Sequence, residues 1–280
     1  MLSGGRAAAS LCNLRDRAMA GEPPVLVTRR AAVAELTLNR PTVGNAIDVP
    51  MARALMETAI ACDEDDSIRC VLLTGAGRLF CAGGDVAAFS AAGDGASALV
   101  KEITAYLHAA IAKLARMSKP LITAVNGPAA GAGFSLAILG DVALAASSSH
   151  FTLAYSAIGL TPDGGSTWLL PRLIGLRRAQ ELVLMNRRVS AAEAAAIGLV
   201  TRIVDDASLM DDARTVADNI AGQATGALGQ ARRLLLESFH SSLESQMERE
   251  SRAIAEAIRT PHGREGLKAF LGKRKPEFKA

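Results

Sequence analysis

Three glycine-rich segments carry the residue types that could do chemistry in this chain. They read GAGRLFCAGGDV at 75–86, VNGPAAGAGFSLA at 125–137 and GLTPDGGSTWLLPRLIG at 159–175. Small residues at the start of a helix leave backbone N–H groups free to bind an anion. Two such loops meeting at one oxygen would form an oxyanion hole, which stabilises negative charge developing on a carbonyl. Glycine spacing alone is also typical of tight turns and helix caps.

Other kinds of catalytic or metal site are not indicated. The four cysteines have no CxxC spacing, and the four histidines are scattered along the chain. We therefore expect reduced cysteines, no structural zinc and no other metal site. We interpret His108 and His150 as packing or surface residues, and no Ser/His/Asp order stands out.

Short strand-like runs alternate with longer helical ones from about residue 25. Apolar runs of strand length, each followed by turn residues, occupy 33–38, 70–74, 121–125 and 142–145. Apolar residues at helical spacing occupy 49–62 and 96–117. This alternation predicts an α/β fold built from parallel βαβ units.

The chain divides into three expected regions. Residues 1–20 hold three arginines against one aspartate, which fits either an organelle transit peptide or a disordered bacterial extension with Met19 as an alternative start. Residues 21–195 form the expected core. Residues 196–280 form a C-terminal helical region, with candidate helices at 209–221, 227–239 and 243–259 and a break at Pro261.

Size and charge limit the function further. A chain of 280 residues with 50% hydrophobic residues can bury a large core without disulfide bonds or a structural metal. A net charge of +3 and the lack of a basic stripe argue against nucleic acid as a partner. No apolar run reaches the roughly 20 residues that a membrane helix needs, so we expect a soluble, cytoplasmic protein.

The content and order of the three segments resemble the enoyl-CoA hydratase/isomerase (crotonase) family over about residues 25–279. Besides the three segments, the matching motifs are TLNRP at 37–41, GLVTRIV at 198–204 and KAFLGKRKPEF at 268–278. The resemblance implies a crotonase-like spiral of ββα units with a C-terminal helical trimerisation region, and a homotrimer or homohexamer. It also implies an acyl-CoA thioester as ligand, so coenzyme A would be part of the substrate and no separate cofactor is expected.

The resemblance assigns the two oxyanion-hole amides to Gly84 and Ala132. Backbone donors need no side chain, so alanine can serve at the second position. Holding the thioester oxygen as it becomes enolate-like acidifies the neighbouring carbon. We interpret Asp85 as a residue that caps or braces the first loop.

The sequence departs from the family's hydratases at both glutamate positions, where it has Ser135 and Tyr155. Neither side chain replaces a carboxylate in adding water to a double bond. Asp163 matches an aspartate of non-hydratase branches, and its segment resembles the 2-(1,2-epoxy-1,2-dihydrophenyl)acetyl-CoA isomerase branch, of phenylacetate degradation. Asp163 is therefore the candidate base, although it could instead be the N-cap of a helix beginning near Gly164. For Ser135 we favour a hydrogen bond to a carbonyl one turn back.

Matches to known contact positions also suggest where coenzyme A binds. They are Val43, Gly44 and Ala82, together with Phe270 and Lys273, which in relatives reach the nucleotide from a neighbouring subunit. A lysine suits a phosphate and an aromatic ring can lie against adenine, but a solvated basic tail is the alternative for the last pair.

Three functions remain open from the sequence. The first is an acyl-CoA isomerase that uses Asp163, with an enoyl-CoA hydratase of fatty-acid metabolism as its near alternative. The second is a non-catalytic acyl-CoA-binding subunit, suggested by the missing glutamates. The third, nucleic-acid binding, is disfavoured by the modest charge.

Overall fold

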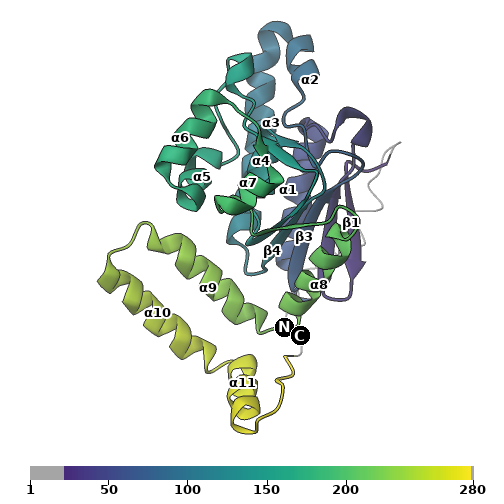
Figure 1. Ribbon diagram of the computed structural model, residues 1–280. Coiled ribbons are helices and arrows are strands. Elements are labelled where there is room, and N and C mark those ends of the chain that lie inside the picture. Colours follow the sequence, from purple (N-terminus) through teal and green to yellow (C-terminus); the bar gives the residue numbers. More distant parts are fainter. Residues whose placement is uncertain (1–21, 279–280) are drawn as a thin grey trace, which may run out of the picture.

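The computed structural model describes residues 22–278, so the expected extension over 1–20 lies outside the described residues. Figure 1 shows an α/β body with a helical C-terminal part below it. The strands are β1 (Val25–Arg30), β2 (Val33–Leu38), β3 (Cys70–Gly75), β4 (Leu121–Val125), β5 (Ala129–Ala130), β6 (Val142–Ala146), β7 (His150–Thr152), β8 (Val189–Ser190) and β9 (Arg202–Val204). The helices are α1 (Val49–Glu64), α2 (Val86–Ala91), α3 (Ala96–Arg116), α4 (Ala132–Ala137), α5 (Ser166–Ile174), α6 (Leu176–Met185), α7 (Ala191–Ala196), α8 (Leu209–Ala221), α9 (Thr225–Ser238), α10 (Leu243–Ala257) and α11 (Pro261–Leu271).

The main sheet contains the four strands that the sequence predicts. Its order is β1-β2-β3-β4-β6-β9, with β1 antiparallel to β2 and the remaining neighbours parallel. The inner strands are buried on both faces, which is why they appear in the sequence as continuous apolar runs. The predicted parallel α/β construction is confirmed.

A smaller sheet stacks successive turns of the chain. Its order is β5-β7-β8, and single bridges extend it from Ile47 to Gly84 and from Cys81 to Ala129. Each turn of the chain thus adds one strand to the main sheet and one segment to the smaller one. This spiral brings the first two glycine-rich loops side by side, although 48 residues separate Gly84 from Ala132.

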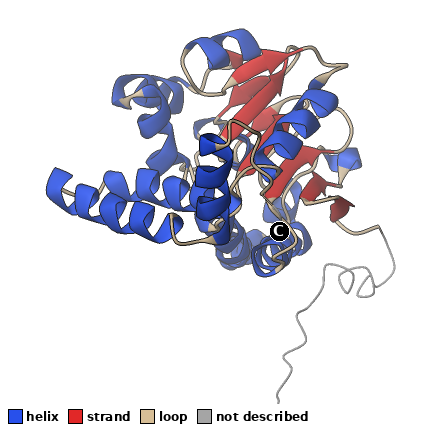
Figure 2. Ribbon diagram, turned by 90° about the horizontal axis from the view of Figure 1, so that it is seen from below, coloured by secondary structure: helices blue, strands red, loops and turns tan. Residues whose placement is uncertain are grey.

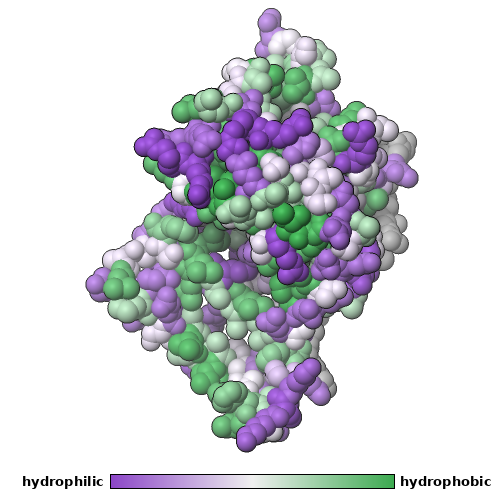
Figure 3. Space-filling view, viewed as in Figure 1, coloured by the Kyte–Doolittle hydropathy of each residue, from purple (hydrophilic) through white to green (hydrophobic). Residues whose placement is uncertain are grey.

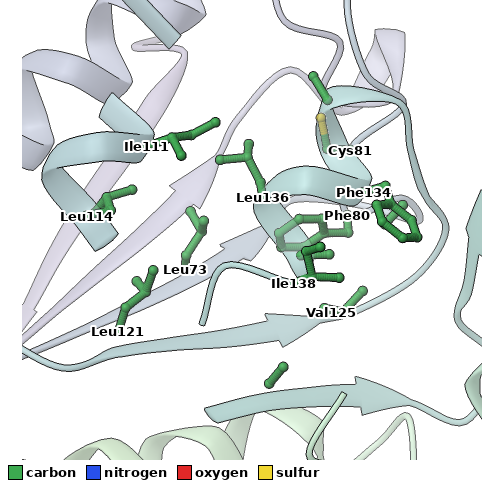
Figure 4. Close-up of a cluster of buried hydrophobic side chains, with 14 of the residues drawn as sticks. Leu73, Phe80, Cys81, Ile111, Leu114, Leu121, Val125, Phe134, Leu136 and Ile138 are labelled. Atoms are coloured by element: carbon green, nitrogen blue, oxygen red, sulfur yellow. The ribbon is translucent and has the colours of Figure 1, made fainter. Parts of the chain in front are cut away.

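The main sheet separates two apolar layers because successive side chains of a strand face opposite sides. On β3, Val71 and Leu73 join the larger cluster with helices α1, α3 and α4. Figure 4 shows part of that cluster, where Leu73 lies near Leu121 and Leu136. Cys70 and Leu72 point to the other face and pack against α8. Figure 2 shows helices on both sides of the sheet.

The core extends past the expected boundary at residue 195. Strand β9 pairs with β6, and α8 covers the second face of the sheet. The helical region that stands clear of the core is therefore α9 to α11. The expected break at Pro261 is present, because α10 ends at Ala257 and Pro261 opens α11 at the first helical position. Thr260 caps α11 by accepting a hydrogen bond from the Gly263 N–H.

Helix α9 is held to the body by a buried arginine. The Arg232 guanidinium pairs with Asp141 at 2.7 Å and donates to the carbonyls of Met117 and Lys119. Beyond this anchor, α9, α10 and α11 expose apolar side chains, among them Leu235, Leu243, Ile254 and Phe270. Figure 3 shows apolar surface along the lower helices. A trimerisation role for this region stays a prediction.

No helix within residues 22–278 combines the length and apolarity needed to cross a membrane.

Candidate active site

One cavity of about 350 Å³ brings together residues from all three glycine-rich segments. Gly84, Ala132 and Asp163 all line it. Most of its remaining wall is apolar and comes from α2, α3 and the segment before α5, including Phe89, Ile103, Leu107, Ile158 and Leu160. The cavity can therefore hold an apolar acyl group next to backbone donors and one carboxylate.

The first loop approaches the second so closely that it needs glycine. Gly83 has a φ of +100°, and a Cβ there would lie 2.9 Å from the Ala130 carbonyl oxygen and 3.4 Å from the Ala132 nitrogen. At Gly84 a Cβ would lie 2.7 Å from Cζ of Phe89. The missing side chains thus let the two loops meet at the cavity wall.

The backbone N–H groups of Gly84 and Ala132 form no hydrogen bond within the described residues. Ala132 is the first residue of α4, where the helix offers no acceptor. Gly84 lies between Gly83, whose carbonyl accepts from Ile47, and Asp85, whose N–H donates to the Ile47 carbonyl. Two unpaired donors on one cavity wall are what an oxyanion hole requires.

The Asp163 carboxyl group is held by two side chains from other segments. Its Oδ1 accepts a hydrogen bond from the Tyr155 hydroxyl at 2.6 Å, and its Oδ2 lies 3.4 Å from Nε2 of His108. It is not a helix cap, because α5 begins at Ser166 with Gly165 as N-cap and no side-chain cap bond. The N-cap alternative for Asp163 is therefore wrong.

Ser135 supports the loop that carries Asp163. Its hydroxyl donates a hydrogen bond to the backbone carbonyl of Asp163 at 2.9 Å. The acceptor therefore lies in another segment, and the expected bond to a carbonyl one turn back in α4 is not the one formed. Gly164, which follows Asp163, packs so tightly on α4 that a Cβ added there would lie 2.8 Å from Cβ of Ser135.

Tyr155 occupies the second glutamate position and acts as a hydrogen-bond donor. Burial, together with the negative charge of Asp163, raises the pKa of the Tyr155 hydroxyl far above its ordinary value. The hydroxyl therefore stays protonated across the working pH range and donates a hydrogen bond to the carboxylate.

His108 is the residue of this site that sequence reasoning missed. It lies in α3, 55 residues before Asp163, and was expected to pack or face solvent. Only the packing of the α5 segment against α3 brings the two together, and no local pattern indicates that contact.

The expected coenzyme A positions fall into two groups. Val43, Gly44 and Ala82 are neighbours, since the Ala82 N–H donates to the Gly44 carbonyl at 2.8 Å, and Ala82 lines the cavity. Phe270 and Lys273 do not line it, and α11, which carries Phe270, lies at the opposite end of the molecule from α2. Their contact with coenzyme A stays a prediction that needs a second subunit.

The other polar residues here have structural explanations. Asp85 caps α2 by accepting from the Ala88 N–H and pairs with Arg40 at 3.3 Å, as expected for a loop brace. Burial raises the pKa of the Cys81 thiol to about 12, so it stays neutral beside the loop. Among residues 22–278 no three His, Cys, Asp or Glu side chains gather closely enough to hold a metal ion.

The chain is similar to known proteins over most of its length. Residues 28–280 match the family described as enoyl-CoA hydratase/isomerase. The chain is 41% identical to 1,2-epoxyphenylacetyl-CoA isomerase of Escherichia coli (strain K12), over 88% of this chain and 94% of that protein. It is 36% identical to a probable enoyl-CoA hydratase of Rhodobacter capsulatus, again over 88% and 94% of the two chains.

A solved structure gives the same fold. The crystal structure of an enoyl-CoA hydratase from Polaromonas sp. JS666 superposes with a TM-score of 0.87 at 34% identity, covering 91% of this chain and 99% of that chain. The crotonase-like spiral with its C-terminal helical region is thus confirmed, as is the resemblance to this family and to its ring-epoxide isomerases. The chain belongs to the enoyl-CoA hydratase/isomerase family.

Proposed function

We propose that this protein is an acyl-CoA isomerase that shifts a proton, and with it a double bond, through a thioester enolate. The observation that carries the proposal is the composition of the cavity. Asp163 is the one carboxylate among the described residues that line it, and it faces the same space as the two unpaired amides. One base that takes and returns a proton is enough for this reaction.

In the proposed mechanism, the thioester carbonyl oxygen accepts from the N–H groups of Gly84 and Ala132. Asp163 takes a proton from the carbon next to the carbonyl, and the charge moves onto the oxygen held by the two amides. The protonated Asp163 then gives a proton to the carbon two positions further along, and the double bond moves into conjugation with the carbonyl. Before substrate binds, the Tyr155 hydroxyl donates a hydrogen bond to the Asp163 carboxylate and orients that carboxylate.

The near alternative is an enoyl-CoA hydratase, because several similar relatives carry that name. Hydration requires groups that position a water molecule and supply a proton to the carbon next to the carbonyl. Here Ser135 is committed to the Asp163 carbonyl and Tyr155 to the Asp163 carboxylate. The name of the relative from Escherichia coli also favours an isomerase.

We further propose that the active assembly is a homotrimer or homohexamer in which Phe270 and Lys273 of a neighbouring subunit contact coenzyme A. Phe270 is 82% exposed in the single chain and Leu271 is 80% exposed, which supports a partner surface at this end. Phe270→Ala and Lys273→Ala should weaken coenzyme A binding without changing the isomerisation step.

The test compares the wild-type protein with Asp163→Asn on two substrates, a 3-enoyl-CoA for isomerisation and a 2-enoyl-CoA for hydration. We expect isomerisation by the wild type and a loss of about 10²–10⁴-fold in turnover in the variant. Calorimetry with a saturated acyl-CoA should give equal affinities for the two proteins, because asparagine preserves the shape of the site.

Two results would contradict the proposal. Rapid hydration that Asp163→Asn leaves unchanged would assign the protein to the hydratases. Tight acyl-CoA binding without turnover of either substrate would support a binding subunit.

A further inference from the structure

Ala154, the residue before Tyr155, adopts a backbone conformation that alanine rarely takes. Its φ is +64°, in the left-handed region, where the Cβ of an L-residue crowds the neighbouring carbonyl oxygen. It lies between the end of β7 and the short 3₁₀ helix Ser156–Ile158, and it lines the same cavity as Asp163. A residue in this conformation persists only where its surroundings hold it.

The side chain of Asn186 holds Ala154. Its Oδ1 accepts a hydrogen bond from the Ala154 N–H at 2.6 Å, across 32 residues of sequence, and no other acceptor for this N–H is present among residues 22–278. Asn186 directly follows α6 and is itself left-handed, with a φ of +49°, which asparagine tolerates better than most residues. Asparagine therefore supplies both the backbone conformation and the acceptor, whereas glycine would supply only the first.

Asn186 stands on a part of the fold that is held firmly. The next residue, Arg187, pairs with Glu181 of α6 at 2.7 Å and with both carboxylate oxygens of Glu193 of α7 at 2.6 and 2.9 Å. Strand β8, which follows, pairs with β7. The position of Asn186 relative to the end of β7 is thus fixed by ion pairs on one side and by a strand pair on the other.

The backbone at Ala154 determines where Tyr155 can place its hydroxyl. On the other side of the ring, the Tyr155 carbonyl accepts from the N–H groups of Ile158 and Leu160. The hydroxyl, at the far end of the ring, donates to Asp163 Oδ1 at 2.6 Å. A small rotation of the backbone at Ala154 would move the hydroxyl off this oxygen, and hydrogen bonds weaken steeply when their angle departs from linear.

We propose that Asn186 is a positioning residue for the isomerisation, because by holding Ala154 it places the Tyr155 hydroxyl on the Asp163 carboxylate. The inference rests on the proposed isomerase function. Asn186 is not among the described residues that line the cavity, so it acts through Tyr155 and not on the substrate. Loss of its acceptor therefore lowers turnover and leaves KM nearly unchanged, since the wall that binds the acyl group stays the same.

Two variants separate the hydrogen bond from the backbone conformation. Asn186→Gly keeps the left-handed backbone and loses the acceptor, whereas Asn186→Asp keeps both. On a 3-enoyl-CoA, we expect turnover to fall about fivefold in Asn186→Gly, with KM within about twofold, and to stay within about twofold of the wild type in Asn186→Asp. Unchanged turnover in Asn186→Gly would overturn the inference, as would an equal loss in Asn186→Asp.

Ser190→Ala is the matched control for a loss of stability. Ser190 lies four residues after Asn186 and accepts a hydrogen bond from the Glu193 N–H at 3.2 Å, so this variant also removes a side-chain acceptor from a backbone N–H. Among the described residues it has no hydrogen bond to Ala154 or Tyr155. We expect Ser190→Ala to lower the melting temperature and to keep turnover within about twofold. A loss of turnover as large as in Asn186→Gly would overturn the positioning role.

A double-mutant cycle tests the route through Tyr155. In Tyr155→Phe no hydroxyl is left to position, so adding Asn186→Gly should lower turnover further by less than about twofold. A full fivefold loss in that background would overturn the route and leave the isomerase assignment intact. A wild-type protein that does not isomerise a 3-enoyl-CoA would overturn the proposed function and the inference together.

Discussion

Two cavities at the Asp163 loop differ in the residues that line them. The inner cavity is the one lined by Gly84 and Ala132, and the outer cavity, of about 700 Å³, lies between α3 and α5 on one side and α9 and α10 on the other. The inner cavity is walled by backbone, small residues and apolar side chains. The outer one has four charged side chains, Arg116, Arg233, Glu237 and Arg249, beside apolar residues of α3, α5 and α9. The smaller cavity is the one suited to chemistry, since stabilising a developing charge requires backbone donors beside the substrate, and Gly84 and Ala132 supply them there.

Two adjacent glycines that both line the outer cavity differ in how tightly they are packed. A Cβ at Gly164 would press against Ser135, whereas at Gly165 no atom lies within 4 Å. Both have positive φ values, so both favour glycine for conformation, but only the first is also fixed by packing. Gly84, Ala132 and Asp163 line the inner cavity, so substitutions there should change turnover far more than substitutions at the outer cavity.

The largest effect among the wall residues is expected for Gly84→Ala. The added Cβ would lie 2.7 Å from the Phe89 ring, which displaces the loop and its N–H from the thioester oxygen. We expect turnover to fall by about 10²-fold, as for loss of one oxyanion donor, measured by steady-state kinetics on a 3-enoyl-CoA.

A second substitution tests the cause. Phe89→Ala removes the ring that the new Cβ meets, so Gly84→Ala with Phe89→Ala should recover part of the lost turnover relative to Phe89→Ala alone. A double variant as slow as Gly84→Ala would mean that the overlap with Phe89 is not what disables the loop.

A smaller effect is expected for Tyr155→Phe. The substitution removes the donor to Asp163 Oδ1 while keeping the ring, and hydrogen bonds to charged groups contribute about 1.5–3 kcal/mol. Turnover should fall by about 10-fold with little change in KM, because Tyr155 acts through the carboxylate. Unchanged turnover would mean that the hydroxyl does not hold the catalytic position of Asp163.

The smallest effect is expected on the outer side. Arg233 lines the outer cavity and is exposed, so Arg233→Gln should leave turnover of a short 3-enoyl-CoA within about twofold of the wild type. A large loss of turnover in Arg233→Gln would contradict the claim that the outer cavity takes no part in the reaction.

The sequence predicted the parts of the fold that local patterns determine. Strands at 33–38 and 121–125 were found at the expected residues because both are short, mainly apolar runs followed by turn residues. The placement of β9 and α8 on the core could not be found this way, since it depends on the sheet edge and face that the rest of the spiral leaves open. Pro261 is ambiguous locally, because proline both ends and begins helices.

The same division holds for the candidate site. The glycine loops could be recognised from residue types and family resemblance, and the spiral explains why they meet. The contact of His108 with Asp163 depends on packing between α3 and a loop 55 residues later, which no spacing rule indicates. The sequence identified the loops that bear backbone donors, but not the side chains that hold the carboxylate.

The most direct test of the account is a crystal structure with a saturated acyl-CoA bound. We predict the thioester oxygen at about 2.7–3.1 Å from the nitrogens of both Gly84 and Ala132, with the adjacent carbon facing the Asp163 carboxyl group across the inner cavity. An acyl chain seated in the outer cavity, or a thioester oxygen that contacts neither amide, would contradict it.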